Sequence, residues 1–144
     1  MKNLIILFSL FLALTPELDW KTDFQEAKDL SKTSDKKILL VFSGSDWCKP
    51  CIQLHRSLFE TEEFAAYAKD HLVLLKADFP YQKKNQLSKE QSAKNEALAA
   101  KYNPDGAFPL AVFLDAEGHV LGSFGFDKTK TATTYIQEFE KYLK

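Results

Sequence analysis

Apolar and polar positions follow one another along the chain in a way that predicts both strands and helices. Two continuous apolar runs, residues 38–42 and 72–77, are typical of central strands buried on both faces. Because a helical segment fits between them, we expect these two strands to run parallel. Two further runs, residues 110–114 and 119–124, are separated by a short polar segment, which predicts an antiparallel hairpin.

Helical periodicity covers the remaining segments. Thr22 or Asp23 is a candidate N-cap for the first helix, and Ser88 can form a capping box with Gln91 at a later one. The segments that we expect to be helical are residues 23–33, 50–59, a short helix from 61, 88–102 and the C-terminal stretch around 135–143. The resulting order, α-β-α-α-β-α-β-β-α, predicts an α/β fold with a central mixed sheet and helices on both faces.

Composition predicts one folded domain without a polyanionic partner. Hydrophobic residues make up 45% of the 144 residues, twelve of them Phe, which favours a packed core over disorder. The formal net charge is −1, and the lysine pairs at 36–37 and 83–84 are too short to form basic patches. We therefore expect no nucleic-acid partner, no stable membrane span and a monomer.

The first residues resemble a targeting segment. Lys2 supplies a positive start, and residues 4–14 are apolar except for Ser9. This stretch is shorter than the roughly 17–25 residues that a membrane-spanning helix needs, so residues 1–15 are interpreted as a signal peptide and residues 16–144 as the mature domain. The alternative is a buried N-terminal helix of a cytosolic protein. Export predicts a periplasmic or secreted location, where disulfides persist.

The two cysteines carry the clearest chemistry. They occur in Trp47-Cys48-Lys49-Pro50-Cys51, directly after the first predicted strand and at the start of a predicted helix. There Cys48 faces unpaired backbone N–H groups and the positive helix end, and Lys49 adds a positive charge, so its thiolate is favoured. Cys51 lies one turn later and can close a disulfide with Cys48. This arrangement indicates a redox motif.

Two other uses of the cysteines remain open at this point. The pair could be a fixed structural disulfide, although its short spacing has no long loop to constrain. His55 shares a helical face with both cysteines, and the three could bind a soft metal ion. Because a closed site normally needs four ligands, we expect neither a metal nor another cofactor.

The element order, the Trp-Cys-x-x-Cys motif and Phe108-Pro109 just before the third central strand resemble the thioredoxin superfamily. The resemblance covers roughly residues 20–143. Within the superfamily, Leu18-Asp19-Trp20 and the block from Ser43 to Cys48 are similar to exported bacterial thioredoxin-like proteins and to the C-terminal domain of transmembrane disulfide reductases.

The resemblance implies a thioredoxin fold, and a thiol–disulfide oxidoreductase in which Cys48 attacks and Cys51 resolves. Pro109 would be the cis-proline beside the disulfide, and the backbone of Phe108 would meet the substrate. The bulky Phe108 ring would either narrow access or fill the edge of the core. Trp47, Lys49 and Pro50 would support the site. Protein dithiols and disulfides would be substrates, and an upstream electron donor would complete the cycle.

One position departs from the thioredoxin pattern. Thioredoxins carry a buried aspartate six residues before the first cysteine, and this chain has Phe42 there. Asp46 is a nearby alternative proton acceptor for Cys51, as is a water molecule, and slower resolution of mixed disulfides is the resulting hypothesis. Pro50 resembles the reducing branch, so we expect a reductase; the alternative is a metal-binding or partner-docking module without redox turnover.

Overall fold

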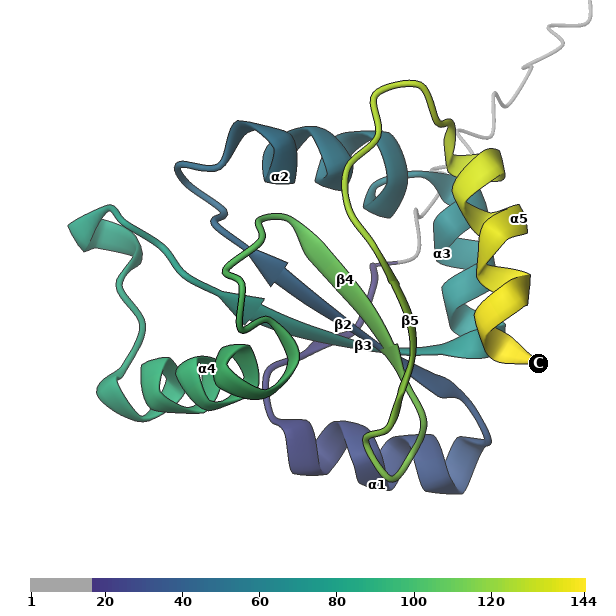
Figure 1. Cartoon of the computed structure of the whole chain (residues 1–144), viewed down its shortest axis with the longest axis horizontal. Helices are drawn as coiled ribbons and strands as arrows, with labels where there is room; N and C mark the ends of the chain where they lie inside the picture. The colour runs from purple at the N-terminus through teal and green to yellow at the C-terminus, as the bar shows by residue number, and fades with distance from the viewer. Residues whose placement is uncertain (1–16) are drawn as a thin grey trace, which may run out of the picture.

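The computed structural model describes residues 17–144, and its centre is a mixed five-stranded sheet with the strand order β1-β3-β2-β4-β5 (Figure 1). The strands are β1 (Trp20–Lys21), β2 (Lys37–Ser43), β3 (Leu72–Asp78), β4 (Leu110–Leu114) and β5 (Val120–Phe124). The first three strands pair in parallel, and β4 runs antiparallel to both β2 and β5. The predicted fold class, the parallel central pair and the hairpin are confirmed.

Helices cover both faces of this sheet. In chain order they are α1 (Phe24–Ser34), α2 (Lys49–Leu54), the π-helical turn η1 (His55–Phe59), α3 (Glu62–His71), the short 3-10 helix η2 (Lys83–Asn85), α4 (Lys89–Tyr102) and α5 (Ala132–Leu143). Figure 1 shows α1 and α4 on one face and α2, α3 and α5 on the other. The thioredoxin fold expected from the resemblance is therefore confirmed.

The alternation of side chains along β2 divides the core in two. Ile38, Leu40 and Phe42 pack toward α1 and α4, whereas Leu39 and Val41 pack toward α2, α3 and α5. All five are at least nine-tenths buried, and each contributes on the order of 1.5–3 kcal/mol relative to an exposed side chain. Because side chains on both faces of β2 are buried, the sequence of this strand is a continuous apolar run.

Local capping explains where the helices begin. Asp23, Thr61 and Ser88 each accept a hydrogen bond from a backbone N–H one turn into the following helix. The capping box expected at Ser88 forms only in part, because the side chain of Gln91 bonds Thr22 O and Asn95 instead. These contacts tie α4 to the segment before α1.

The helix expected over residues 50–59 differs from the observed structure. It is α-helical only as far as Leu54, and the π-helical turn His55–Phe59 follows, closed by the Glu60 N–H bond to His55 O. The strand expected over 119–124 begins at Val120. The proposed signal peptide, residues 1–15, lies outside the described residues. Within residues 17–144, no helix combines the length and apolarity required to cross a bilayer.

Candidate active site

The cysteine motif occupies the junction between β2 and α2. Cys48 is the N-cap residue of α2, and its Sγ accepts a hydrogen bond from the Cys51 backbone N–H at 3.3 Å. Pro50 lies in the first turn, where its missing N–H costs no helical bond. The sulfurs of Cys48 and Cys51 are bonded to each other, and both residues are 4% exposed. The disulfide therefore lies at the positive end of a helix, just below the surface.

A glycine gives the turn before the motif its shape. The carbonyl of Gly44 accepts hydrogen bonds from the N–H groups of Trp47 and Cys48, at 3.3 and 2.9 Å. A Cβ at position 44 would overlap the indole ring of Trp47, so no larger residue fits while the ring keeps its place. Asp78, the last residue of β3, holds the same turn through the Ser45 N–H and hydroxyl.

Three aromatic rings pack in a row next to the cysteine motif. Trp47 is half exposed and packs edge-on against Phe108 at 5.6 Å between centroids, and Phe108 packs in turn against Phe79 at 5.5 Å. The indole Nε1 of Trp47 donates to the Phe79 carbonyl at 2.7 Å. Phe108 is thus part of the core edge and also borders the motif, so both of its expected roles fit its position.

Pro109 and Lys49 are two further residues that the sequence placed at the site. The Phe108–Pro109 peptide bond is cis, as predicted, and Pro109 lines a small cavity together with Cys51 and Val41. Lys49 is the first residue of α2 and its side chain is exposed.

Asp46 is bound to a neighbouring loop. Its carboxylate accepts hydrogen bonds from the N–H groups of Tyr81 and Gln82, at 2.8 and 2.9 Å, and from the side chain of Asn85 at 2.9 Å. These bonds, that of Tyr81 first, lower the pKa of Asp46 below its ordinary value. A carboxylate that is so well satisfied, with a lowered pKa, is a poor proton acceptor. Asp46 is therefore an anchor for the loop rather than a base for Cys51.

The surroundings of Cys51 contain polar groups to which the sequence analysis gave no role in thiol exchange. An open cavity of about 280 Å³ beside Cys51 is lined by Ser43, His55, Glu60 and Lys76, among others. Phe42 packs on the opposite face of the sheet and does not line this cavity. The sequence could have indicated Lys76 as a functional candidate, because it is the one charged residue within the apolar run 72–77.

His55 is held by a neighbouring carboxylate. Its Nδ1 lies 3.0 Å from Glu60 Oε1, across the π-helical turn. Among residues 17–144, no group of three or more His, Cys, Asp or Glu side chains has the arrangement of a metal site. The set of Cys48, Cys51 and His55 considered from the sequence is therefore not brought together as ligands.

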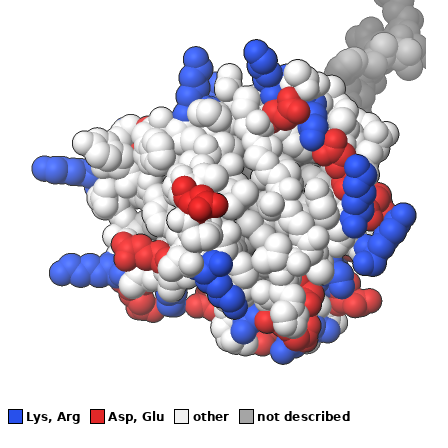
Figure 2. All heavy atoms as spheres, viewed as in Figure 1, with Lys and Arg blue, Asp and Glu red and all other residues white. Residues whose placement is uncertain are grey.

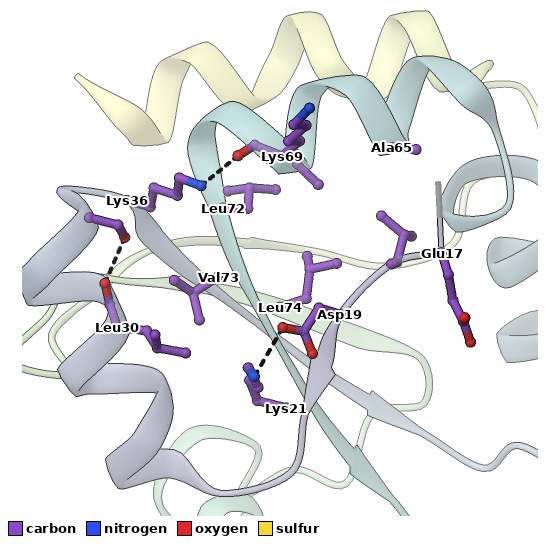
Figure 3. Close-up of a pocket in the computed structure, with 13 residues that line it drawn as sticks. Glu17, Asp19, Lys21, Leu30, Lys36, Ala65, Lys69, Leu72, Val73 and Leu74 are labelled. Atoms are coloured by element: carbon purple, nitrogen blue, oxygen red, sulfur yellow. Dashed lines mark hydrogen bonds and ion pairs between the residues drawn. The ribbon is translucent and has the colours of Figure 1, made fainter. Parts of the chain in front are cut away.

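Another hollow lies away from the cysteines. It has a volume of about 470 Å³ and lies beside β1, between α1 and α3 (Figure 3). Leu72 and Leu74 of β3 contribute apolar surface, and Lys36 crosses one end to donate to the Lys69 carbonyl. None of the residues of the cysteine motif lines it.

Comparison with known proteins identifies the family. A family model described as thioredoxin-like matches residues 19–116, which include the cysteine motif and Pro109. The chain belongs to the thioredoxin-like family. The curated relatives include the disulfide bond reductase DsbH of Chlamydia pneumoniae, which is 39% identical over 127 residues; the match covers 88% of this chain and 74% of DsbH.

A second relative and two solved structures agree with this placement. The thioredoxin-related protein DsbJ of Chlamydia pneumoniae is 29% identical over 140 residues, and the chain spans only 39% of its length. A structure of the DsbH oxidoreductase superimposes with a TM-score of 0.80 at 37% identity, covering 89% of this chain and 85% of that one. The oxidised C-terminal domain of Neisseria meningitidis DsbD shares the fold, with a TM-score of 0.53 at 18% identity, covering 81% and 88%.

The cysteine geometry and the family membership agree on one class of chemistry. A Cys-x-x-Cys pair lies at a helix N-terminus in a thioredoxin-like chain that is similar to a disulfide bond reductase. The chain is a thiol–disulfide oxidoreductase.

Proposed function

We propose that this oxidoreductase reduces disulfides of other proteins through a dithiol–disulfide cycle at Cys48 and Cys51. The observation that carries the proposal is the position of Cys48 Sγ at the N-terminus of α2, within hydrogen-bonding distance of the Cys51 N–H. In the reduced protein, this N–H and the helix end would favour the thiolate of Cys48, which is the form that attacks disulfides.

The proposed cycle has two exchange steps. The Cys48 thiolate attacks one sulfur of the client disulfide, a mixed disulfide forms, and the other client sulfur leaves as a thiolate that takes up a proton. Cys51 then loses its proton and attacks Cys48 Sγ, which releases the second client thiol and leaves the Cys48–Cys51 disulfide. A dithiol donor must reduce that disulfide again. The client is reduced by two electrons, and the cysteine pair is oxidised by two.

The surroundings of Cys48 support the reducing direction. Within residues 17–144, the Cys51 N–H is the one hydrogen-bond donor recorded for Cys48 Sγ. A strongly oxidising pair is one whose reduced form is especially stabilised. The similarity to a protein named as a disulfide bond reductase supports the same direction.

The neighbouring residues have supporting roles in this proposal. Trp47 shields the disulfide on its exposed side, and Lys49 adds positive charge at the helix end. Pro50 lies in the first turn of the helix, while the backbone of Phe108, next to Pro109, meets the client segment. The groups that line the cavity with Cys51 and can carry a proton in the resolving step are His55, Glu60 and Lys76.

The cellular setting is part of the proposal. Residues 1–15 would act as an export leader, and residues 16–144 would work as a monomeric domain in the periplasm or outside the cell. There, clients would be proteins with accessible disulfides, and a separate dithiol protein would supply electrons. The cycle requires no further cofactor.

Single-turnover assays with cysteine variants test this function. The pre-reduced protein is expected to accelerate reduction of an accessible interchain disulfide, such as that of insulin. Cys48→Ala should lower the rate to the uncatalysed value, whereas Cys51→Ala should accumulate a mixed disulfide that is visible by non-reducing mass spectrometry. Activity that persists in Cys48→Ala, or a native protein without activity, would contradict the proposal.

A further inference from the structure

A rigid aromatic surface adjoins the reactive cysteine. Trp47 precedes Cys48 directly, and about half of its surface is open to solvent. Its ring rests on Phe108, its Nε1–H donates to the Phe79 carbonyl, and Gly44 leaves space beneath it. A ring that is fixed on three sides and exposed on the fourth can bind an apolar part of a partner at little entropic cost.

The loop between β3 and α4 (residues 79–88) is fixed beside this surface. Asp46, two residues before Cys48, accepts the N–H groups of Tyr81 and Gln82 and the side chain of Asn85. The Trp47–Phe79 hydrogen bond holds the start of the loop. The side chain of Tyr81 is 81% exposed, so this loop also presents an aromatic ring to solvent.

The charges around this surface are unbalanced. Lys49, Lys83 and Lys84 are exposed, and none of them forms an ion pair within residues 17–144. The carboxylates of Asp46 and Asp78 already accept hydrogen bonds, Asp46 from the loop and Asp78 from Ser45. Figure 2 shows positively charged side chains reaching into solvent at the left edge of the molecule, where Figure 1 draws this loop, with acidic side chains beside the lower of them. The aromatic surface is therefore bordered by unpaired positive charge.

We propose that Trp47, Tyr81 and the lysines of the β3–α4 loop form a docking surface for acidic client segments, in which Asp or Glu lies next to the cysteine that Cys48 attacks. The inference rests on the reducing function proposed above and specifies its substrate class. Carboxylates beside the client cysteine would lie near Lys83 and Lys84, and an apolar neighbour would contact the two exposed rings. Such complementarity raises the rate of productive encounter more than it strengthens the final contact.

Two matched disulfide peptides test the docking surface. Both carry the same looped disulfide and length, but one has Asp and the other Lys at the flanking positions. Each is mixed with pre-reduced protein in single turnovers at low salt, the reaction is quenched with acid, and the free thiols are counted by alkylation. The ratio of the two rates is the readout. Any difference in intrinsic reactivity between the two peptides is the same for every protein variant. A change in the Asp-to-Lys rate ratio from one variant to another therefore reports on the docking surface.

The proposal expects K83E/K84E to lower the Asp-to-Lys rate ratio by about tenfold, and about 0.5 M salt to remove most of this difference. K83A/K84A should shift the ratio in the same direction by a smaller factor. The control, K28E/K32E, makes the same charge change on α1, which contributes no residue to the docking surface, and should keep the native ratio.

A ratio that is equal in the native protein and K83E/K84E, or one that shifts equally in K28E/K32E, would overturn the docking surface. Far-UV circular dichroism of each variant establishes that it is folded. A native protein that reduces neither peptide, and also fails with the small neutral 2-hydroxyethyl disulfide, would instead refute the proposed reducing function.

Discussion

At the scale of single residues, Asp46 links the reactive motif to the rest of the molecule. It lies between Ser45, which bonds Asp78, and Trp47, which bonds the Phe79 carbonyl. Its carboxylate accepts the N–H groups of Tyr81 and Gln82. One side chain therefore sets the distance between the redox helix and the loop that borders it.

The anchoring by Asp46 should depend on pH only in the acid range. Its pKa is lowered from 3.8, chiefly by the Tyr81 N–H, then by the Asn85 side chain and the Gln82 N–H. A lowered pKa means that the stabilising contribution is complete above the ordinary value and is lost as the pH falls through the lower, folded-state value. The amide NMR signals of Tyr81 and Gln82 should stay constant from neutral pH down to about pH 5 and move below 3.8. A midpoint above 3.8 would contradict this assignment.

Removing the carboxylate should release the loop at neutral pH. In Asp46→Ala, amide exchange at Tyr81 and Gln82 should become faster, while exchange in the core of β2 stays unchanged. Asp29→Ala is a matched control, because this exposed carboxylate lies on α1. Equal loop protection in the native protein and in Asp46→Ala would show that the Trp47–Phe79 contact alone fixes the loop.

At the scale of elements, a buried amide connects α4 to the end of β3. Asn95 is 1% exposed, and its Nδ2 donates to the Asp78 carbonyl at 2.8 Å, while its Oδ1 accepts from Gln91. Asp78 in turn holds Ser45, one side of the active-site turn. The position of α4 is thereby coupled to the cysteine motif through two hydrogen-bonded contacts.

Loss of this amide should destabilise the fold. Asn95→Ala leaves the part-buried Asp78 carbonyl without this donor, so we expect the free energy of unfolding to fall by about 1–3 kcal/mol in urea titrations. The adjacent, exposed Glu96 provides the control, and Glu96→Ala should change stability by less than about 0.5 kcal/mol. An unchanged denaturation midpoint in Asn95→Ala would contradict this role.

The elements also show which parts of the structure a sequence can predict. Long buried runs and amphipathic segments led to four strands and five helices, because their periodicity directly reflects burial. The sequence does not predict β1, because the two residues Trp20–Lys21 are too few to show the alternating hydrophobic pattern of a strand. The π-helical turn was missed because apolar spacing does not distinguish it from an α-helix over five residues. At the site, the sequence predicts the cysteine motif and Pro109. It does not predict the hydrogen bonds of Asp46, because their partners are 35 or more residues away and only the tertiary fold brings them close.

At the scale of the whole molecule, the direction of electron transfer depends on the relative stability of the oxidised and reduced forms of the folded protein. If the cysteine pair is reducing, the fold favours the disulfide over the dithiol relative to the unfolded chain. The oxidised protein must then be more stable than the reduced one, the reverse of a strong oxidant, whose reduced form is stabilised. Direction is therefore visible in unfolding experiments as well as in assays.

The two redox forms should differ measurably in urea. We expect the oxidised form to exceed the reduced form in unfolding free energy by on the order of 1–2 kcal/mol, equivalent to roughly 20–45 mV for two electrons. Cys48→Ala/Cys51→Ala, which is redox-inert, should give the same midpoint with and without reductant. A reduced form that is more stable than the oxidised one would argue for an oxidase.

The reduction potential of the Cys48–Cys51 pair distinguishes a reductase from a disulfide-forming catalyst. It is measured by equilibrating the protein with defined ratios of reduced and oxidised glutathione, trapping the thiols by alkylation and counting them by mass spectrometry. A reductase predicts a potential near that of thioredoxin, about −270 mV, or at least below about −220 mV. A value near −120 mV, typical of a disulfide-forming catalyst, would contradict the reducing function.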